Sequence, residues 1–201
     1  MDREETRRPL DADSSEFLDI SIREMTAEDQ GCWTDMDDSF IVDSALVLSF
    51  IASQFTYTVE DIPIYEKRYL EETPEQADEI DDSEYINNPD QVVYLAFAEQ
   101  QAVGRIVLKK NWNRYALIDM IQVDKPFRRH GIGRQLMEQA KCWALERGLP
   151  GVMLETQSIN VRACRFYESC GFVIGGFDQY VYKGIPAVSG EVAVYWYLHF
   201  E

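Results

Sequence analysis

The sequence is poor in basic residues and in potential metal ligands. It holds 19 Lys and Arg against 36 Asp and Glu, so its formal net charge is −17 at pH 7. Nucleic acids bind basic surfaces, and this charge therefore argues against nucleic acid as a partner. His130 and His199 are its two histidines, and its four cysteines lack C-x-x-C spacing. We accordingly expect no metal site.

Long apolar segments are missing too. No uninterrupted apolar run is long enough to span a bilayer, and residues 1–17 mix charges without the apolar stretch of a secretory signal. These absences predict a cytoplasmic protein that does not bind membranes, with its thiols reduced. The cysteines are then expected to be small buried apolar residues. With 201 residues, 46% of them apolar, the chain can build the core of one domain.

Hydrophobic periodicity predicts how the chain is organised. Residues 1–18 are polar and aperiodic and predict a flexible tail, followed by a single domain over residues 19–201. The later segments predict a hairpin at 91–110, strands at 115–123, 151–156, 172–182 and 191–200, and helices at 131–147 and 160–170. This order predicts an α/β (α+β) fold, with helices packed over a mixed, twisted sheet.

Two earlier segments are less clear. Residues 44–59 are apolar and β-branched, which fits either a strand or a helix. Residues 66–84 carry nine acidic side chains against Lys67 and Arg68. Such a run is typical of a solvated loop, although it would also attract a polyamine.

The stretch VDKPFRRHGIGRQLMEQA, residues 123–140, places arginines and glycines between a strand and a helix. The first amides of a helix lack intrahelical partners, and the helix dipole is positive there, so an anion is favoured. Glycines let a diphosphate approach these amides, and Arg128, Arg129 and Arg134 add positive charge. No G-K-[ST] follows, and the third glycine of a dinucleotide site is absent. The stretch therefore predicts a phosphate-binding loop of another kind.

This loop and a second segment resemble the GNAT N-acetyltransferase superfamily. The pattern R-x-x-G-x-G stands at residues 128–133, after a strand that ends at Val123, and NVRACRFYESCGF at residues 160–172 matches a second element. Four phrases further resemble the streptothricin acetyltransferases: EYINN, KKNWNRYALI, LETQ and WYLHF. The resemblance implies the GNAT fold with six or seven strands and acetyl-CoA as donor. It also implies antibiotic resistance, through direct transfer in a ternary complex to an amine of the β-lysine moiety of streptothricin, which is cationic.

The same resemblance implies which residues contact acetyl-CoA. Backbone amides at the end of a bulged strand meet the thioester and pantetheine, and the loop meets the phosphates. These residues are Ile121, Gln122, Val123, Arg128, Arg129, His130, Gly131, Ile132, Gly133, Arg134 and Asn160. Tyr167 stands where the superfamily often keeps a tyrosine that protonates the departing thiolate. Asn160 is also expected to cap its helix.

Two carboxylates are candidates for the base that takes a proton from the amine. An alkylammonium has a pKa of about 10.4, so reaching the neutral form near pH 7 costs roughly 4–5 kcal/mol. A carboxylate is a suitable proton acceptor. Asp119 lies within a strand, where a period of two places it on one face with Leu117, Ile121 and Val123. Glu155 on the next strand competes with it, and for each an ion pair is the alternative role.

The cationic acceptor is expected near Asp81, Asp82, Glu84 and Tyr85, because carboxylates and an aromatic face attract an ammonium group. Two other functions remain open. One is acetylation of a different amine, such as a polyamine or a protein N-terminus. The other is a catalytically silent module that binds acetyl-CoA as a sensor. Superfamily members are often dimers, so a homodimer is one form to test.

Overall fold

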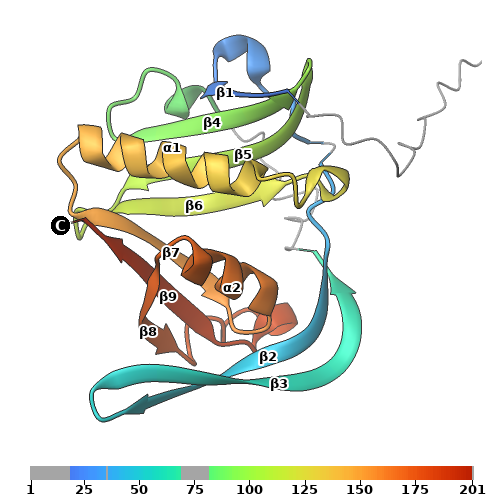
Figure 1. The fold of residues 1–201 in the computed structure, drawn as a ribbon, viewed down its shortest axis with the longest axis vertical. Coiled ribbons are helices and arrows are strands. Elements are labelled where there is room, and N and C mark those ends of the chain that lie inside the picture. The colour runs from blue at the N-terminus through green and yellow to red at the C-terminus, as the bar shows by residue number, and fades with distance from the viewer. Residues whose placement is uncertain (1–18, 35, 69–81, 201) are drawn as a thin grey trace, which may run out of the picture.

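A computed structural model of the protein describes residues 19–34, 36–68 and 82–200, so the expected tail at residues 1–18 lies outside the described residues. Seven strands form one sheet in the order β1-β4-β5-β6-β7-β9-β8 (Figure 1). They are β1 (Ile20–Glu24), β4 (Gln91–Ala98), β5 (Gln101–Lys110), β6 (Ala116–Val123), β7 (Gly151–Gln157), β8 (Val173–Asp178) and β9 (Ala193–His199). Only β6 and β7 pair in parallel in this sheet. The expected mixed sheet and its hairpin at 91–110 are confirmed.

Both long helices pack on one face of the sheet (Figure 1). α1 (Ile132–Glu146) buries the positions predicted from its periodicity, which are Ile132, Leu136, Ala140, Trp143 and Ala144. α2 (Val161–Ser169) adds Val161, Cys164 and Tyr167 to the same core. Each helix ends at a glycine in a Schellman motif: the amides of Gly148 and Leu149 bond to the carbonyls of Leu145 and Ala144, and Gly171 and Phe172 repeat the pattern in α2.

The opposite face of the sheet is covered by short segments. Next to β4 and β5, a cluster around Trp33, Leu95 and Phe97 includes the segment that follows the 3-10 turn η1 (Ala27–Asp29). The turn η2 (Asp82–Tyr85) contributes Tyr85 to this cluster. Two further turns, η3 (Lys125–Phe127) and η4 (Pro186–Val188), lie in the loops after β6 and β8.

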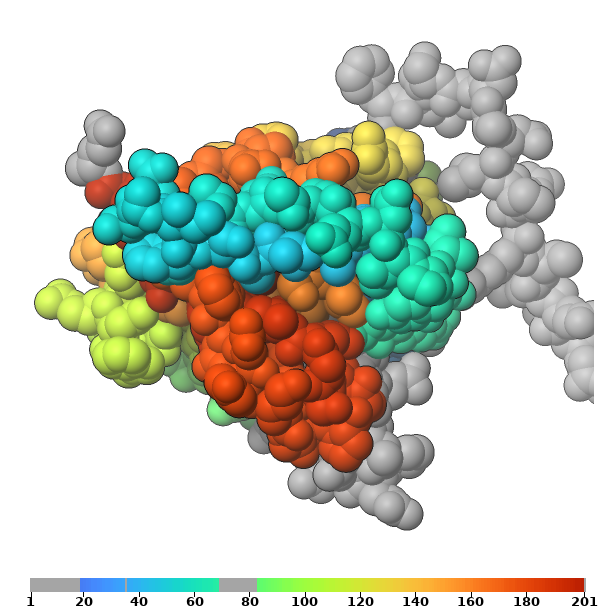
Figure 2. Space-filling model, turned by 90° about the horizontal axis from the view of Figure 1, so that it is seen from below, coloured from blue at the N-terminus to red at the C-terminus, as the bar shows by residue number. Residues whose placement is uncertain are grey.

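The ambiguous residues 44–59 form strands, not a helix. They belong to a hairpin of β2 (Phe40–Ile51) and β3 (Gln54–Lys67), which pair only with each other in a second sheet. The register shifts after Val42, and on β3 the shift includes Pro63, which has no N–H to donate. Figure 2 shows the hairpin crossing one face of the molecule beside β8 and the loop that follows it. An ion pair between Lys67 and Glu191 fixes β3 to that loop.

Several local predictions need correction. The strand expected at 172–182 ends at Asp178, because the carboxylate of Asp178 accepts bonds from the amides of Tyr180 (2.6 Å) and Val181 (3.2 Å) and turns the chain. Cys164 and Cys170 are buried as expected, but Cys32 and Cys142 are exposed.

Within the described ranges, none of the helices has the length and apolar character needed to cross a membrane.

Candidate active site

The parallel strands at the centre of the sheet separate after a short contact. In the described chain, β6 and β7 pair only where Ala116–Ile118 face Val152–Leu154. Beyond this contact β6 stays paired with β5 and β7 stays paired with β9, so β6 and β7 separate from each other and leave a gap (Figure 1). In a sheet of this kind, ligands bind beyond the carboxyl ends of parallel strands, where helices begin. α1 follows β6 and α2 follows β7, which marks this gap as the candidate site.

A β-bulge lies at the point where the strands separate. Met120 pairs with Val107 and Ile118 pairs with Leu108, so Asp119 is the extra residue of the bulge. The expected bulge in this strand is therefore present. The expected face of Asp119 is wrong in part, because the bulge shifts the alternation. Ile121 and Val123 pack against the helix-side core, whereas Asp119 is exposed.

The loop after β6 leads to an open helix start. Gly131 precedes α1 with φ 81°, in the left-handed region that glycine adopts at little cost, and no side chain caps the helix. A Cβ at Gly131 would meet nothing within 4 Å, so the space beside the first amides of α1 is open. At Gly133 a Cβ would lie 3.4 Å from the ring of Phe166 on α2. Free amides, open space and a positive dipole fit a phosphate group.

The basic side chains of this loop have different partners. Arg128 is half-buried, and its guanidinium donates to three backbone carbonyls: Val123 (2.9 Å), Ser39 (2.6 Å) and Asp37 (2.9 Å). Burial lowers the pKa of Arg128 from its usual value. Arg129 is exposed and, among the described residues, makes no hydrogen bond or ion pair. Of the two, Arg129 is the one available to a ligand.

Two more basic side chains, one in the first turn of α1 and one in the loop, make limited contacts. Arg134 donates to the carbonyl (3.2 Å) and the hydroxyl (3.0 Å) of Ser169 at the end of α2. A nitrogen of the exposed His130 ring lies 3.3 Å from the carbonyl of Phe127. The first contact connects the start of α1 to the end of α2, and the second lies within the loop.

The two candidate bases stand directly after the paired segment, Asp119 after Ile118 on β6 and Glu155 after Leu154 on β7. Asp119 forms an ion pair with Lys109, with 2.6 Å between the charged atoms. Glu155 instead accepts a hydrogen bond from the hydroxyl of Tyr182, in the loop between β8 and β9. Burial, then the hydrogen bond and the charge of Glu155, raises the pKa of Tyr182 well above its usual value. The two carboxylates thus have different neighbours: an ammonium group and a hydroxyl group.

The remaining predicted residues of this region lie on or beside α2. Asn160 caps the helix as expected, since its side-chain oxygen accepts from the amide of Ala163 at 3.2 Å. Tyr167 is buried, with 7% of its surface exposed, and its ring contacts Phe166, Phe172 and Trp196. The backbone of Ile121, Gln122 and Val123 borders the gap from the β6 side.

The acceptor residues predicted from sequence are only partly described. Asp81 lies outside the described residues, and Asp82 is described only as the start of η2. Glu84 is exposed, and its carbonyl accepts bonds from Asn88 and Gln91. Tyr85 packs beside Trp33 in the cluster on the far side of β4 and β5.

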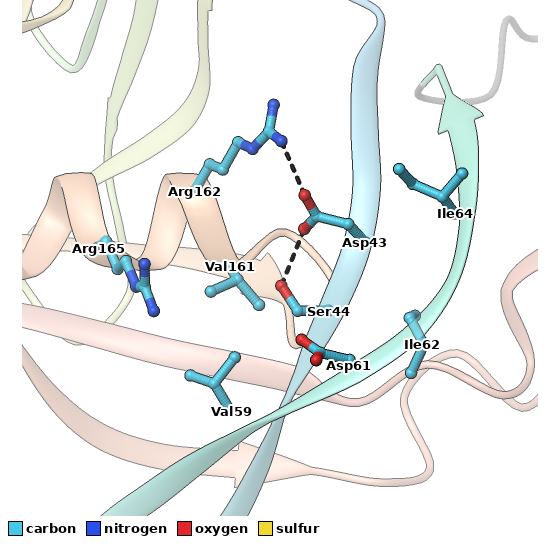
Figure 3. Close-up of a pocket in the computed structure, with 9 residues that line it drawn as sticks. All are labelled: Asp43, Ser44, Val59, Asp61, Ile62, Ile64, Val161, Arg162 and Arg165. Carbon is cyan, nitrogen blue, oxygen red and sulfur yellow. Dashed lines mark hydrogen bonds and ion pairs between the residues drawn. The ribbon is translucent and has the colours of Figure 1, made fainter.

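A depression of about 600 Å³ lies between the hairpin and the start of α2 (Figure 3). Figure 3 shows Arg162 reaching from α2 toward Asp43 on β2, with a contact of 2.8 Å. The carboxylate of Asp43 also accepts from the hydroxyl of Ser44 at 2.9 Å. Leu46 on β2 adds a backbone bond to Ser158, 2.9 Å long, just before α2. The hairpin is therefore tied to the end of β7 and borders the candidate site.

Sequence reasoning missed two residues that contact the site. The sequence pattern places Tyr182 at the end of a strand, and it marks Gln157 only as part of the LETQ phrase. Gln157 lies on the same face of β7 as Glu155, and its side chain lowers the pKa of Tyr182, which burial and Glu155 raise. The turn residue Asp178, together with Gly184 and Pro186, was the available signal that Tyr182 belongs to a loop. Nothing in the local pattern indicates that this loop reaches Glu155.

Known proteins match this chain over most of its length. Streptothricin acetyltransferase A of Bacillus subtilis (strain 168) is 35% identical over 179 residues, which cover 89% of this chain and 99% of the relative. Streptothricin acetyltransferase of Escherichia coli is 39% identical over 163 residues, which cover 81% and 87%. A Bacillus anthracis str. Ames structure in complex with acetyl coenzyme A, assigned as a streptothricin acetyltransferase, is 51% identical, with a TM-score of 0.81 and coverage of 92% and 100%.

The family model described as Acetyltransferase (GNAT) family matches residues 58–172, more than half of the 201 residues. That range includes the bulged strand, the glycine loop, both helices and Glu155. Strand separation, the open start of α1 and this match lead to one assignment. The chain belongs to the GNAT acetyltransferase family.

Proposed function

We propose that this protein transfers the acetyl group of acetyl-CoA to an amine of the β-lysine moiety of streptothricin. The transfer is direct, with donor and acceptor bound together, and it inactivates the antibiotic. One observation carries the proposal. β6 and β7 separate immediately after Ile118 and Leu154, with the open start of α1 beyond one strand and the Glu155 carboxylate on the other. The similarity to streptothricin acetyltransferases over nearly the whole chain supports the choice of acceptor.

Acetyl-CoA is the acetyl donor, and the glycine loop suits its phosphates. The amides of Ile132 and Gly133 at the open start of α1 hold the diphosphate, and the exposed Arg129 supplies positive charge beside them. The β6 edge at Ile121–Val123 borders the pantetheine and thioester, where backbone amides stabilise charge that develops on the carbonyl oxygen. Arg128 has a different role in this proposal. It fixes residues 37 and 39 to the loop.

Glu155 is the proposed base. The amine reaches the site as an ammonium and must lose a proton before it can attack. At Asp119 an incoming ammonium would have to displace Lys109, whereas Glu155 has a hydroxyl as its neighbour. The Glu155 carboxylate takes the proton, directly or through water. It is exposed, so a ligand can reach it.

Tyr167 is the proposed acid for the departing thiolate. Its burial among Phe166, Phe172 and Trp196 fixes the ring in the last turn of α2. A phenol is neutral at pH 7 and has a proton to give. The positions of Glu155 and Tyr167 on consecutive elements, β7 and α2, suit a base for the incoming amine and an acid for the outgoing sulfur.

The direct test is a mass measurement on the antibiotic. Streptothricin incubated with acetyl-CoA and this protein should gain the mass of one acetyl group, with release of a stoichiometric amount of free thiol. A polyamine and a peptide with a free N-terminus serve as comparison acceptors. If either comparison acceptor is acetylated faster than streptothricin, that amine is the substrate and the proposed acceptor is wrong. Binding of acetyl-CoA without acetylation of any amine would favour the sensor function.

A pair of arginine variants separates the two roles proposed for the loop. Arg128→Ala removes three bonds to backbone carbonyls, and we expect it to cost about 2–4 kcal/mol and to lower the thermal midpoint by roughly 5–15 °C. Arg129→Ala, one position on, should leave the midpoint unchanged and weaken acetyl-CoA binding a few-fold. Thermal unfolding and titration calorimetry measure the two effects. Equal midpoints for the two variants would contradict this division.

A further inference from the structure

The loop between β8 and β9 places Tyr182 against the end of β7. Tyr182 is buried, with 8% of its surface exposed, beside Val188, Ala193 and Tyr195. Its hydroxyl reaches the carboxylate of Glu155, 27 positions earlier in the chain. The loop is internally bonded, since the carbonyl of Tyr182 accepts from the amide of Ile185 at 2.9 Å and the carbonyl of Ile185 accepts from the amide of Val188 at 3.1 Å. The tyrosine is therefore held by packing and backbone bonds before any ligand arrives.

The hydroxyl of Tyr182 is a hydrogen-bond donor to the Glu155 carboxylate. The side chain of Gln157, two positions further along β7, also acts on this phenol and lowers its pKa, an effect smaller than that of burial. Because the pKa of Tyr182 is raised, chiefly by burial, the hydroxyl stays protonated and remains a donor at any ordinary assay pH. The phenolic proton therefore lies in the hydrogen bond to the carboxylate.

The groups around this carboxylate are mainly hydroxyls. Tyr195 lies directly across from Glu155 on β9, and burial together with the charge of Glu155 raises the pKa of Tyr195. Asp178 and Tyr197 are the other titratable groups that act on Tyr195. None of these groups is a cation, so none of them forms an ion pair with Glu155 that an incoming ammonium would have to displace. A hydroxyl partner fixes its orientation without neutralising it.

We infer that Tyr182 is a positioning residue, which holds the Glu155 carboxylate at the separation of β6 and β7 in the orientation that takes the amine proton. This inference rests on the proposed function, in which Glu155 is the base. The loop between β8 and β9 then contributes to catalysis, because a displacement of the loop would break the hydrogen bond between Tyr182 and Glu155. A base misplaced by about 1 Å loses a large part of its effect, roughly 10- to 100-fold.

The test is Tyr182→Phe, which removes one oxygen and keeps the buried ring. We expect kcat to fall roughly 10- to 100-fold while the KM for acetyl-CoA stays unchanged. Tyr180→Phe is the matched control, since Tyr180 lies in the same loop with 76% of its surface exposed, and it should behave like the parent. Thermal unfolding of each variant shows that the core around the ring is intact. A Tyr182→Phe enzyme with parental kcat would overturn the inference.

A double-mutant cycle distinguishes positioning from a general effect on structure. If Tyr182 acts through Glu155, Tyr182→Phe should have almost no further effect once Glu155→Gln is present. Losses that multiply would show that Tyr182 acts by another route, and the inference would fail while the base assignment stood. A Glu155→Gln enzyme with parental kcat would remove the base, and the inference with it. The cycle can be measured with any amine that the parent acetylates, so failure of streptothricin as the acceptor is a separate outcome.

Discussion

Glu155→Gln is expected to lower kcat by about 10²–10⁴-fold at neutral pH, the usual contribution of a positioned general base. Glutamine keeps the size of the side chain and an oxygen that accepts from Tyr182, so packing is preserved and the proton acceptor alone is lost. Affinity for acetyl-CoA should stay at the parental value, because the phosphate site at the start of α1 is untouched. Steady-state kinetics with both substrates varied, together with titration of acetyl-CoA, measure this separation.

The matched control is Asp119→Asn on the neighbouring strand. Asp119 stands at the same level of the gap, but it forms an exposed ion pair with Lys109, and such pairs contribute little. We expect its kcat to remain within about threefold of the parent, because an exposed ion pair that takes no proton from the amine contributes little. A large loss in Asp119→Asn with none in Glu155→Gln would make Asp119 the base.

The defect of Glu155→Gln should shrink as pH rises. An alkylammonium has a pKa of about 10.4, so on the order of 1 in 10³ amine groups is neutral at pH 7 and far more are neutral at pH 9. The base is needed only while the amine arrives protonated. The ratio of parental to variant kcat/KM should therefore fall between these pH values. A constant ratio would mean that Glu155 supports the fold or the acceptor instead of taking a proton.

Local patterns predicted much of the fold after residue 90. The periodicity of α1, the glycines that end both helices and the cap at Asn160 depend on neighbours a few positions away, and the structure has all of them. The hairpin of β2 and β3 was ambiguous for a physical reason. Its strands pair only with each other and leave many apolar side chains exposed, so residues 44–59 show neither a clean strand alternation nor a helical stripe.

The site was predictable in its motif and not in its long-range contacts. The glycine loop follows from spacing, but Arg128 bonds to carbonyls about 90 positions earlier, and its sequence context gave no sign of them. The face of Asp119 depends on a bulge that exists only in register with β5. Tyr182 reaches Glu155 because Asp178 ends β8 early and the chain turns back. Each of these facts requires knowing which strands are neighbours.

Gly151→Ala is expected to lower the stability of the fold strongly. Gly151 starts β7 and is paired with His199 on β9, and a Cβ there would lie 2.0 Å from the carbonyl oxygen of Leu198. That oxygen belongs to a strand held between β7 and β8, so neither side can move away freely. We expect a loss of about 3 kcal/mol or more, seen as a fall of roughly 6–12 °C in the thermal midpoint.

The control for this substitution is Gly190→Ala, where an added Cβ would meet nothing within 4 Å. Its midpoint should match the parent, which separates the clash at Gly151 from the general effect of replacing glycine by alanine. β9 also carries Tyr195 opposite Glu155, so a shift of β9 that relieves the clash would disturb the carboxylate. Gly151→Ala enzyme that remains folded should therefore lose kcat as well. A parental midpoint for Gly151→Ala would mean that β7 and β9 are not packed as closely as the structure has them.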